Sequence, residues 1–342
     1  MPARIRRLRW AIPAFSILFL LVAEGALRGR QYMRYGTVGS VHALATHEQT
    51  GLRIPIPHKQ TARISIDSQG FRSPELELPK PAGRQRIAFL GGSTTFCAEA
   101  TSGAASWPGQ VFAGLDAQDP GRYDYLNVGV PGYTVESSQR SFESRVVPNA
   151  PDLVLIYHAY NDLVCDTRDL AEAEGFAKPE PAVDWLGERS LLWHLLRQNV
   201  FVRLRVQQVQ AAAALECDFS VLAEAFGQRT EALVRAVQAS GAEAVLLTFA
   251  YRGNAQLEEA QQADAAVSAL RYMPYLRPEG VLAGIEAYNQ ALRDAAERTG
   301  AQLLECADAV PGTEQNFNDS VHLLDPGCRL LAERILGLLR ER

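Results

Sequence analysis

Two short segments far apart in the sequence carry side chains that could work together in catalysis. Ser93 follows two glycines in Gly91-Gly92-Ser93, and His322 follows Asp319 by three positions. In a tight turn this spacing lets the carboxylate accept from one imidazole nitrogen while the other nitrogen faces a nucleophile. Serine needs such a base within about 3 Å, because its hydroxyl is a poor nucleophile at neutral pH.

Each of these residues also has a plainer interpretation. Ser93 in isolation is typical of a helix N-cap, and the GxSxG elbow of α/β-hydrolases is absent because Thr95 occupies its last position. Asp319 and His322 could instead ligate a metal ion, although no further His or Cys clusters with them and no HExxH motif occurs. We therefore expect no metal and no cofactor.

Two further segments offer hydrogen-bond donors suited to a developing oxyanion. Gly129 lies in Asn127-Val128-Gly129-Val130-Pro131-Gly132, where a backbone N–H can approach a ligand, and Asn161 carries a neutral carboxamide. Glycine and asparagine at such positions are otherwise common turn residues. We interpret His158 and Asp162, which flank Asn161, as local hydrogen-bonding residues with no part in proton transfer.

All four segments follow runs that read as buried strands. Short apolar stretches alternate with helical ones, which favours a doubly wound α/β domain with about five mostly parallel strands and helices on both faces. Ligands of such folds bind at the carboxyl ends of the strands. The expected strands are 86–90, 125–130, 152–157, 244–249 and 302–305, with helices at 107–115 and 135–147.

The segments around this domain differ in character. Residues 31–83 contain many prolines and no strong period, which predicts an extended N-terminal arm; residues 84–342 form the domain itself. Insertions near 162–220 and 251–279 leave strand carboxyl ends, a placement that suits substrate selection, although long surface loops are also tolerated without function.

The first 30 residues have the pattern that export machinery reads. Arg4, Arg6, Arg7 and Arg9 precede an uncharged apolar stretch from Trp10 to Ala23. We predict a signal anchor that forms a transmembrane helix, with the catalytic domain on the periplasmic or extracytoplasmic side, and a cleaved signal peptide with secretion as the alternative.

Composition excludes several other classes. The 342 residues carry 34 basic and 39 acidic side chains, a net charge of −5, which gives no electrostatic footprint for nucleic acid. The 47% hydrophobic fraction is that of an ordinary globular protein. The five cysteines form no close pair, so neither a zinc site nor a redox motif is expected, and disulfide pairing stays open.

Taken in order, the GGS at Ser93, the NxGxxG around Gly129, the ND at Asn161 and the DxxH ending in His322 resemble the SGNH (GDSL-type) hydrolase superfamily, here as a membrane-anchored bacterial-type member. The resemblance covers residue 84 to the C-terminus and implies a flavodoxin-like fold and an esterase or acyl-transfer site. It implies Ser93 as nucleophile, His322 as general base and Asp319 as its orienting carboxylate. The Ser93 amide, the Gly129 amide and the Asn161 side chain would form the oxyanion hole. The family's common Gly-Asp-Ser is Gly-Gly-Ser here, which weakens a narrow lipase assignment.

The leading functional hypothesis is a serine esterase that hydrolyses small acyl esters, such as O-acetyl groups of carbohydrate or cell-envelope polymers, through an acyl-serine intermediate. One alternative is an O-acyltransferase in envelope polysaccharide modification. The other is a catalytically silent glycan-binding or scaffold domain. The expected partners are an acyl-ester substrate and, through the N-terminal segment, a membrane.

Overall fold

The computed structural model describes residues 3–35, 44–177, 190–196 and 214–340. Its centre is a parallel sheet of five strands in the order β4-β3-β5-β6-β7. Because the first strand of the sheet lies between the second and the third, the chain winds outward in both directions, as in flavodoxin-like folds. The strands are β3 (Gln85–Gly91), β4 (Tyr123–Asn127), β5 (Leu153–Tyr157), β6 (Glu243–Leu247) and β7 (Gln302–Leu304). The predicted α/β class with a five-stranded parallel sheet is therefore confirmed.

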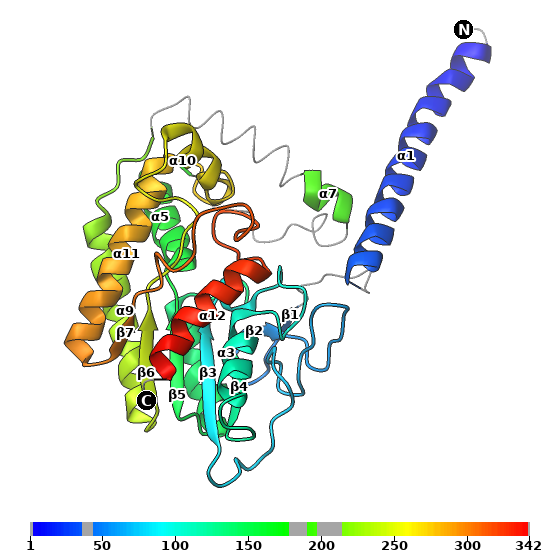
Figure 1. Cartoon of the computed structure of the whole chain (residues 1–342). Coiled ribbons are helices and arrows are strands. Elements are labelled where there is room, and N and C mark those ends of the chain that lie inside the picture. Colours follow the sequence, from blue (N-terminus) through cyan, green and yellow to red (C-terminus); the bar gives the residue numbers. More distant parts are fainter. Residues whose placement is uncertain (1–2, 36–43, 178–189, 197–213, 341–342) are drawn as a thin grey trace.

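Helices cover both faces of this sheet (Figure 1). On one face α3 (Trp107–Asp116) packs against α12 (Asp325–Leu339), and on the other α9 (Phe219–Ala239) packs against α11 (Pro278–Thr299). Further helices of the domain are α2 (Ser93–Phe96), α4 (Val135–Ser141), α5 (Tyr160–Ala173), α7 (Leu191–Leu196), α10 (Glu259–Ala266) and the 3₁₀ turn η4 (Ala269–Arg271).

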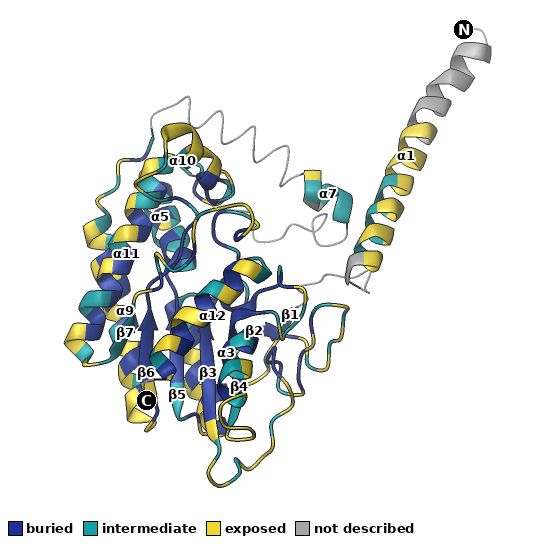
Figure 2. Cartoon of the chain, viewed as in Figure 1, coloured by how far each residue is buried: buried dark blue, intermediate teal, exposed yellow. Residues whose placement is uncertain are grey.

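The core lies between the sheet and these helices, where the three central strands β3, β5 and β6 are buried along almost their whole length (Figure 2). Apolar runs such as Leu153–Tyr157 lack a polar alternation because both faces of the sheet are covered. Phe89 of β3 and Trp107 of α3 meet edge to face, with ring centroids 5.2 Å apart. The five cysteines all lie in the described part of the chain, and each is a free thiol.

The helix expected over 135–147 is interrupted. After α4 the chain widens into a π-turn, η1 (Phe142–Val146), and then tightens into a 3₁₀ turn, η2 (Val147–Asn149). Pro148 explains the end, because it has no N–H to continue an α-helix and its ring crowds the preceding turn.

The arm does not extend away from the domain. It forms an antiparallel hairpin, β1 (Leu44–Thr46) with β2 (Arg53–Pro55), and continues along the β4 side of the sheet (Figure 1). Ile64, Ile66 and Phe71 are each at most 2% exposed, so this segment contributes to the core.

The N-terminal helix α1 (Ala3–Tyr35) corrects the prediction of a membrane anchor. Within the described residues, no helix has both the length and the apolar character that a bilayer crossing requires. Glu24 interrupts the apolar stretch: its carboxylate accepts from Ser190 Oγ and from the amides of Leu191 and Leu192 at the start of α7. The predicted transmembrane anchor, and the localisation that rested on it, are therefore wrong.

The two predicted insertions are described to different extents. The first insertion begins within α5, and its residues 178–189 and 197–213 lie outside the described ranges. The second contains α10 and η4. Ser320, which is 1% exposed, holds it to the segment that carries Asp319: Ser320 Oγ lies 2.6 Å from Ser268 Oγ and accepts from the Ala269 amide at 3.1 Å.

Candidate active site

The nucleophile candidate stands at a sharp turn between β3 and α2. Ser93 is the first residue of α2, so its amide has no partner within the helix. Two glycines make the turn possible by close approach. A Cβ on Gly91 would lie 2.0 Å from Thr95 Oγ1, and one on Gly92 would lie 2.4 Å from Asn161 Nδ2. Glycine at 92, where the family commonly has Asp, thus leaves room for the Asn161 carboxamide beside the nucleophile.

The far end of this turn is also constrained. Cys97 closes α2 in the left-handed region, with φ +55°, and its amide donates to Ser93 O at 2.8 Å. A non-glycine residue in this region carries strain that its surroundings must offset. Trp107 Nε1 donates to Thr94 O at 3.0 Å, which ties the turn to α3.

Ser93, His322 and Asp319 form a hydrogen-bonded line. His322 Nε2 lies 2.8 Å from Ser93 Oγ, and His322 Nδ1 lies 2.8 Å from Asp319 Oδ2. The other carboxylate oxygen accepts from the amides of Val321 and His322 at 3.0 and 2.9 Å, so the turn itself orients Asp319. Residues 229 positions apart therefore meet with the geometry of a nucleophile, a base and an orienting carboxylate.

Electrostatics favour a charged Asp319. Burial raises the pKa of the Asp319 carboxyl, but hydrogen bonds from His322 and the positive charge of its imidazolium outweigh this and hold the pKa below its usual range. Burial lowers the pKa of His322; the hydrogen bond and charge of Asp319, with a smaller contribution from Glu99, raise it to about 9.

Asn161 lies beside the nucleophile at the start of α5. One N–H of its carboxamide donates to Tyr133 O at 2.8 Å, which fixes the side chain and leaves the second N–H available. Together with the unpaired Ser93 amide, this group forms a donor pair that could face a developing oxyanion.

The Gly129 amide is placed differently from what the sequence led us to expect. It donates to Asn127 Oδ1 at 3.0 Å, and a Cβ at this position would lie 2.4 Å from Phe96 N, so Gly129 packs against the nucleophile helix. Gly132, with φ +86°, lies in the same loop; in the described part of the chain its N–H has no hydrogen-bond acceptor. The sequence-based expectation named Gly129, the first glycine of the motif, and did not consider Gly132, the second.

His158 and Asp162 have structural contacts. His158 is buried and its Nε2 lies 2.8 Å from Ser138 Oγ; burial lowers its pKa to about 3, so the ring is neutral. Asp162 accepts from the Val135 amide at 3.1 Å and thereby joins α4 to α5. Of the described residues, no group of three or more His, Cys, Asp or Glu could hold a metal ion.

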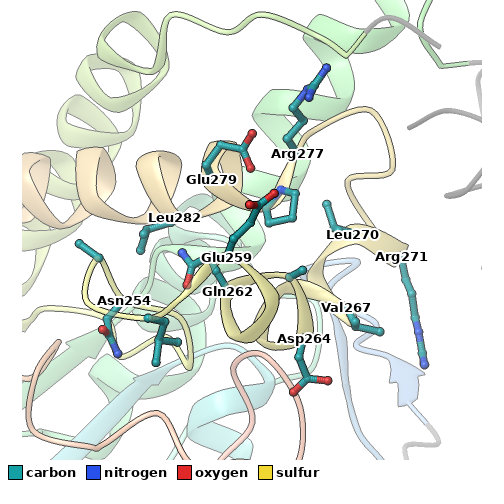
Figure 3. A pocket seen from close by; sticks show the side chains of 14 residues that line it. Asn254, Glu259, Gln262, Asp264, Val267, Leu270, Arg271, Arg277, Glu279 and Leu282 are labelled. Atoms are coloured by element: carbon teal, nitrogen blue, oxygen red, sulfur yellow. The ribbon is translucent and has the colours of Figure 1, made fainter. Parts of the chain in front are cut away.

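The second insertion borders the triad. Tyr272, which follows η4 and is 57% exposed, meets the ring of Tyr160 edge to face with centroids 6.4 Å apart, and Tyr160 is the neighbour of Asn161. Next to it, a cleft of about 1080 Å³ runs between α10, η4 and the start of α11. Figure 3 shows its mixed lining, with Glu259, Gln262 and Arg277 among apolar side chains. None of the triad residues lines this cleft.

The parallel sheet carries at its carboxyl edge a hydrogen-bonded Ser-His-Asp set, an arrangement that occurs in serine hydrolases of several folds. The chain matches the GDSL-like lipase/acylhydrolase family over residues 89–330, and it belongs to that family. No curated protein matches the chain.

The solved structures that match this chain share little sequence with it. An acetylxylan esterase from Geobacillus stearothermophilus is 17% identical, with a TM-score of 0.46 over 74% of this chain and 93% of that one. A lipase/acylhydrolase from Enterococcus faecalis is 14% identical, with a TM-score of 0.45 over 75% and 96%. An α/β hydrolase from the metagenome of Lake Arreo, Spain, is 16% identical, with a TM-score of 0.46 over 74% and 94%.

Proposed function

We propose that this esterase removes small acyl groups, such as acetyl, from hydroxyls of carbohydrate or cell-envelope polymers through an acyl-Ser93 intermediate. The observation that carries the proposal is the unbroken line of 2.8 Å contacts from Ser93 Oγ through His322 to Asp319. The proposed substrate class rests on the side chains around the rim of the site.

The proposed reaction starts with neutral His322. Its Nε2 takes the Ser93 proton while Oγ attacks the ester carbonyl, and Asp319 stabilises the imidazolium that forms. The oxyanion accepts from the Ser93 amide and the Asn161 carboxamide, each worth roughly 3 kcal/mol. We assign the third donor to Gly132 in place of Gly129, because the Gly129 N–H already serves Asn127. His322 then protonates the leaving alkoxide, and water attacks the acyl-serine by the same route in reverse.

The exposure of the triad favours a substrate whose ester group projects from a larger molecule. The side chains of His322 and Asp319 are 20% and 27% exposed, so the catalytic groups are reachable from the surface. Tyr272, whose ring meets that of Tyr160 next to Asn161, offers an exposed aromatic face, and the cleft in the second insertion is lined by amide and charged side chains that can bind hydroxyls. These features favour a polyhydroxylated leaving group.

Tyr272→Ala tests this substrate class. We expect the KM for an acetylated xylo-oligosaccharide to rise between about twofold and tenfold, because aromatic ring contacts contribute roughly 0.5–1.5 kcal/mol. The kcat/KM for 4-nitrophenyl acetate should change less than about twofold, since that substrate has no sugar to bind. Tyr272→Phe serves as the matched control and should retain the oligosaccharide KM.

Two outcomes would contradict the proposed substrate. Unchanged KM for the oligosaccharide in Tyr272→Ala would remove the aromatic face from substrate binding, and wild-type preference for long-chain esters would oppose small acyl groups. Product analysis with an added sugar acceptor distinguishes the two acyl-enzyme fates: free acetate indicates hydrolysis, and an acetylated acceptor indicates transfer.

A further inference from the structure

The N-terminal arm makes two sets of contacts with the catalytic machinery. The family match begins at residue 89, whereas the arm residues involved lie between 50 and 73. One set reaches the nucleophile turn and the other reaches the loop that holds Asn161. Arg72 and Tyr133, which make these contacts, are both buried, so the contacts are part of the folded domain.

Arg72 makes the first set. This arginine is 2% exposed, and its amide donates to Asn127 O at 3.1 Å. Its guanidinium donates to the carbonyls of both Phe96 and Cys97, at the end of α2, and lies 5.2 Å from the centre of the Phe96 ring. Arg72 therefore satisfies the carbonyls at the left-handed residue that closes the nucleophile turn.

Tyr133 makes the second set. Its hydroxyl donates to Arg53 O of β2 at 2.8 Å, and its ring packs in a small cluster with Leu52, Ile54 and Val130. The carbonyl of the same residue accepts from Asn161 Nδ2. Tyr133 thus connects the hairpin of the arm directly to the carboxamide that faces the nucleophile.

We propose that the arm is a working part of the active site: it holds the nucleophile turn through Arg72 and the oxyanion loop through Tyr133. Arg72 and Tyr133 are positioning residues, because they act through Ser93 and Asn161 and not on the substrate. The inference rests on the proposed function in one respect: the effect of positioning is measured through the rate of a reaction at Ser93. A displacement of about 1 Å in such a site costs on the order of 10²-fold in rate.

The test uses full-length variants and 4-nitrophenyl acetate. Arg72→Met keeps the aliphatic stem and removes the donors, and we expect kcat per active site to fall about 10²-fold with KM within about twofold. Arg72→Lys restores a donor to these carbonyls and should recover about tenfold of that loss. Tyr133→Phe, which deletes only the bond to Arg53, should lower kcat several-fold, on the order of one weak hydrogen bond.

Lys80→Met is the matched control. Lys80 also joins the arm to the domain, through Asp152 at 2.7 Å, but at the amino end of β5 and away from the triad. We expect it to lower the thermal midpoint without changing kcat. A role of Arg72 in stability alone predicts the same behaviour for Arg72→Met, and that result would overturn the proposal.

Hydrogen exchange separates this inference from the proposed function. Arg72→Met should speed amide exchange in residues 93–98, and Lys80→Met should not. If wild type shows no turnover that depends on Ser93, the proposed function fails, but the exchange of residues 93–98 still decides the positioning role. Unchanged exchange and unchanged kcat in both Arg72→Met and Tyr133→Phe would refute it.

Discussion

Two opposing effects set the pKa of His322. Burial disfavours the imidazolium, while Asp319, held charged by the backbone amides of its own turn, favours it and raises the His322 pKa to about 9. The base that accepts the Ser93 proton must be neutral, so the resting protonation state opposes the first step at neutral pH.

This predicts a pH-dependent rate. The kcat/KM for a neutral ester should rise with pH through the His322 pKa, near 9, because only the neutral imidazole can act as base. Replacing Asp319 by Asn should move the inflection to lower pH as well as lower the rate. A pH–rate profile measured from 6 to 10 checks both, and a wild-type profile that is flat above pH 7 would contradict the assignment.

The raised pKa of His322 also makes the stability of the fold depend on pH, in the direction opposite to that of the activity. The folded-state pKa of His322 is raised, so its stabilising contribution is complete below the unfolded value of about 6.5 and is lost as pH rises through about 9. Activity and this part of the stability therefore change in opposite directions over the same range.

Residue types and spacing were enough to nominate Ser93, Asn161, Asp319 and His322, and the structure brings all four to one edge of the sheet. The sequence alone could not distinguish the Gly129 amide from the Gly132 amide as a candidate oxyanion donor. Both are glycines of one loop, and what separates them is the direction of an N–H vector, which depends on the Asn127 side chain and on the close packing of Gly129 against Phe96.

At the scale of elements, the buried parallel strands were predictable because they are apolar without alternation. The break in the helix after Ser141 was not, because a π-turn depends on how the following residues pack. The arm was predicted only as an extended segment; in the structure its Ile64 and Ile66 pack on Phe96 of the nucleophile helix. The many prolines of the arm indicated a segment without regular structure, and they gave no sign of these long-range contacts.

The amino ends of the strands have a structural role that can be separated from catalysis. Arg86 of β3 is wholly buried and makes a two-pronged pair with Asp124 of β4, both bonds 2.8 Å, and it also donates to Asn149 O and Glu77 O. It therefore joins two strands, η2 and the arm at the edge opposite the triad.

Arg86→Met should lower the free energy of unfolding by about 3–5 kcal/mol, because it leaves Asp124 and two carbonyls without their donor. The kcat of the remaining folded protein should be unchanged, since the triad lies at the other end of the strands. Urea unfolding, with kinetics measured well below the midpoint, checks both. A large fall in kcat at full folding would show that the two edges are coupled.

At the level of the whole molecule, the sequence predicted the domain but not how residues 1–83 pack against it. The basic and apolar pattern before residue 24 indicated a membrane anchor, and this was wrong for the described chain: Glu24 is engaged by the start of α7. Its partners, at residues 190–192, are distant in sequence, so no local pattern could show them. The contacts of the arm that follows are likewise made with residues distant in sequence, which come close only after folding.

The central claim is that Ser93 and His322 act as one nucleophilic unit. Its most direct test is the rate of 4-nitrophenyl acetate hydrolysis by the full-length protein, Ser93→Ala and His322→Ala, with folding of each checked by circular dichroism. We expect turnover in wild type and a loss of at least about 10³-fold in both variants, similar in size because the two residues act together. Equal rates in all three proteins would contradict it.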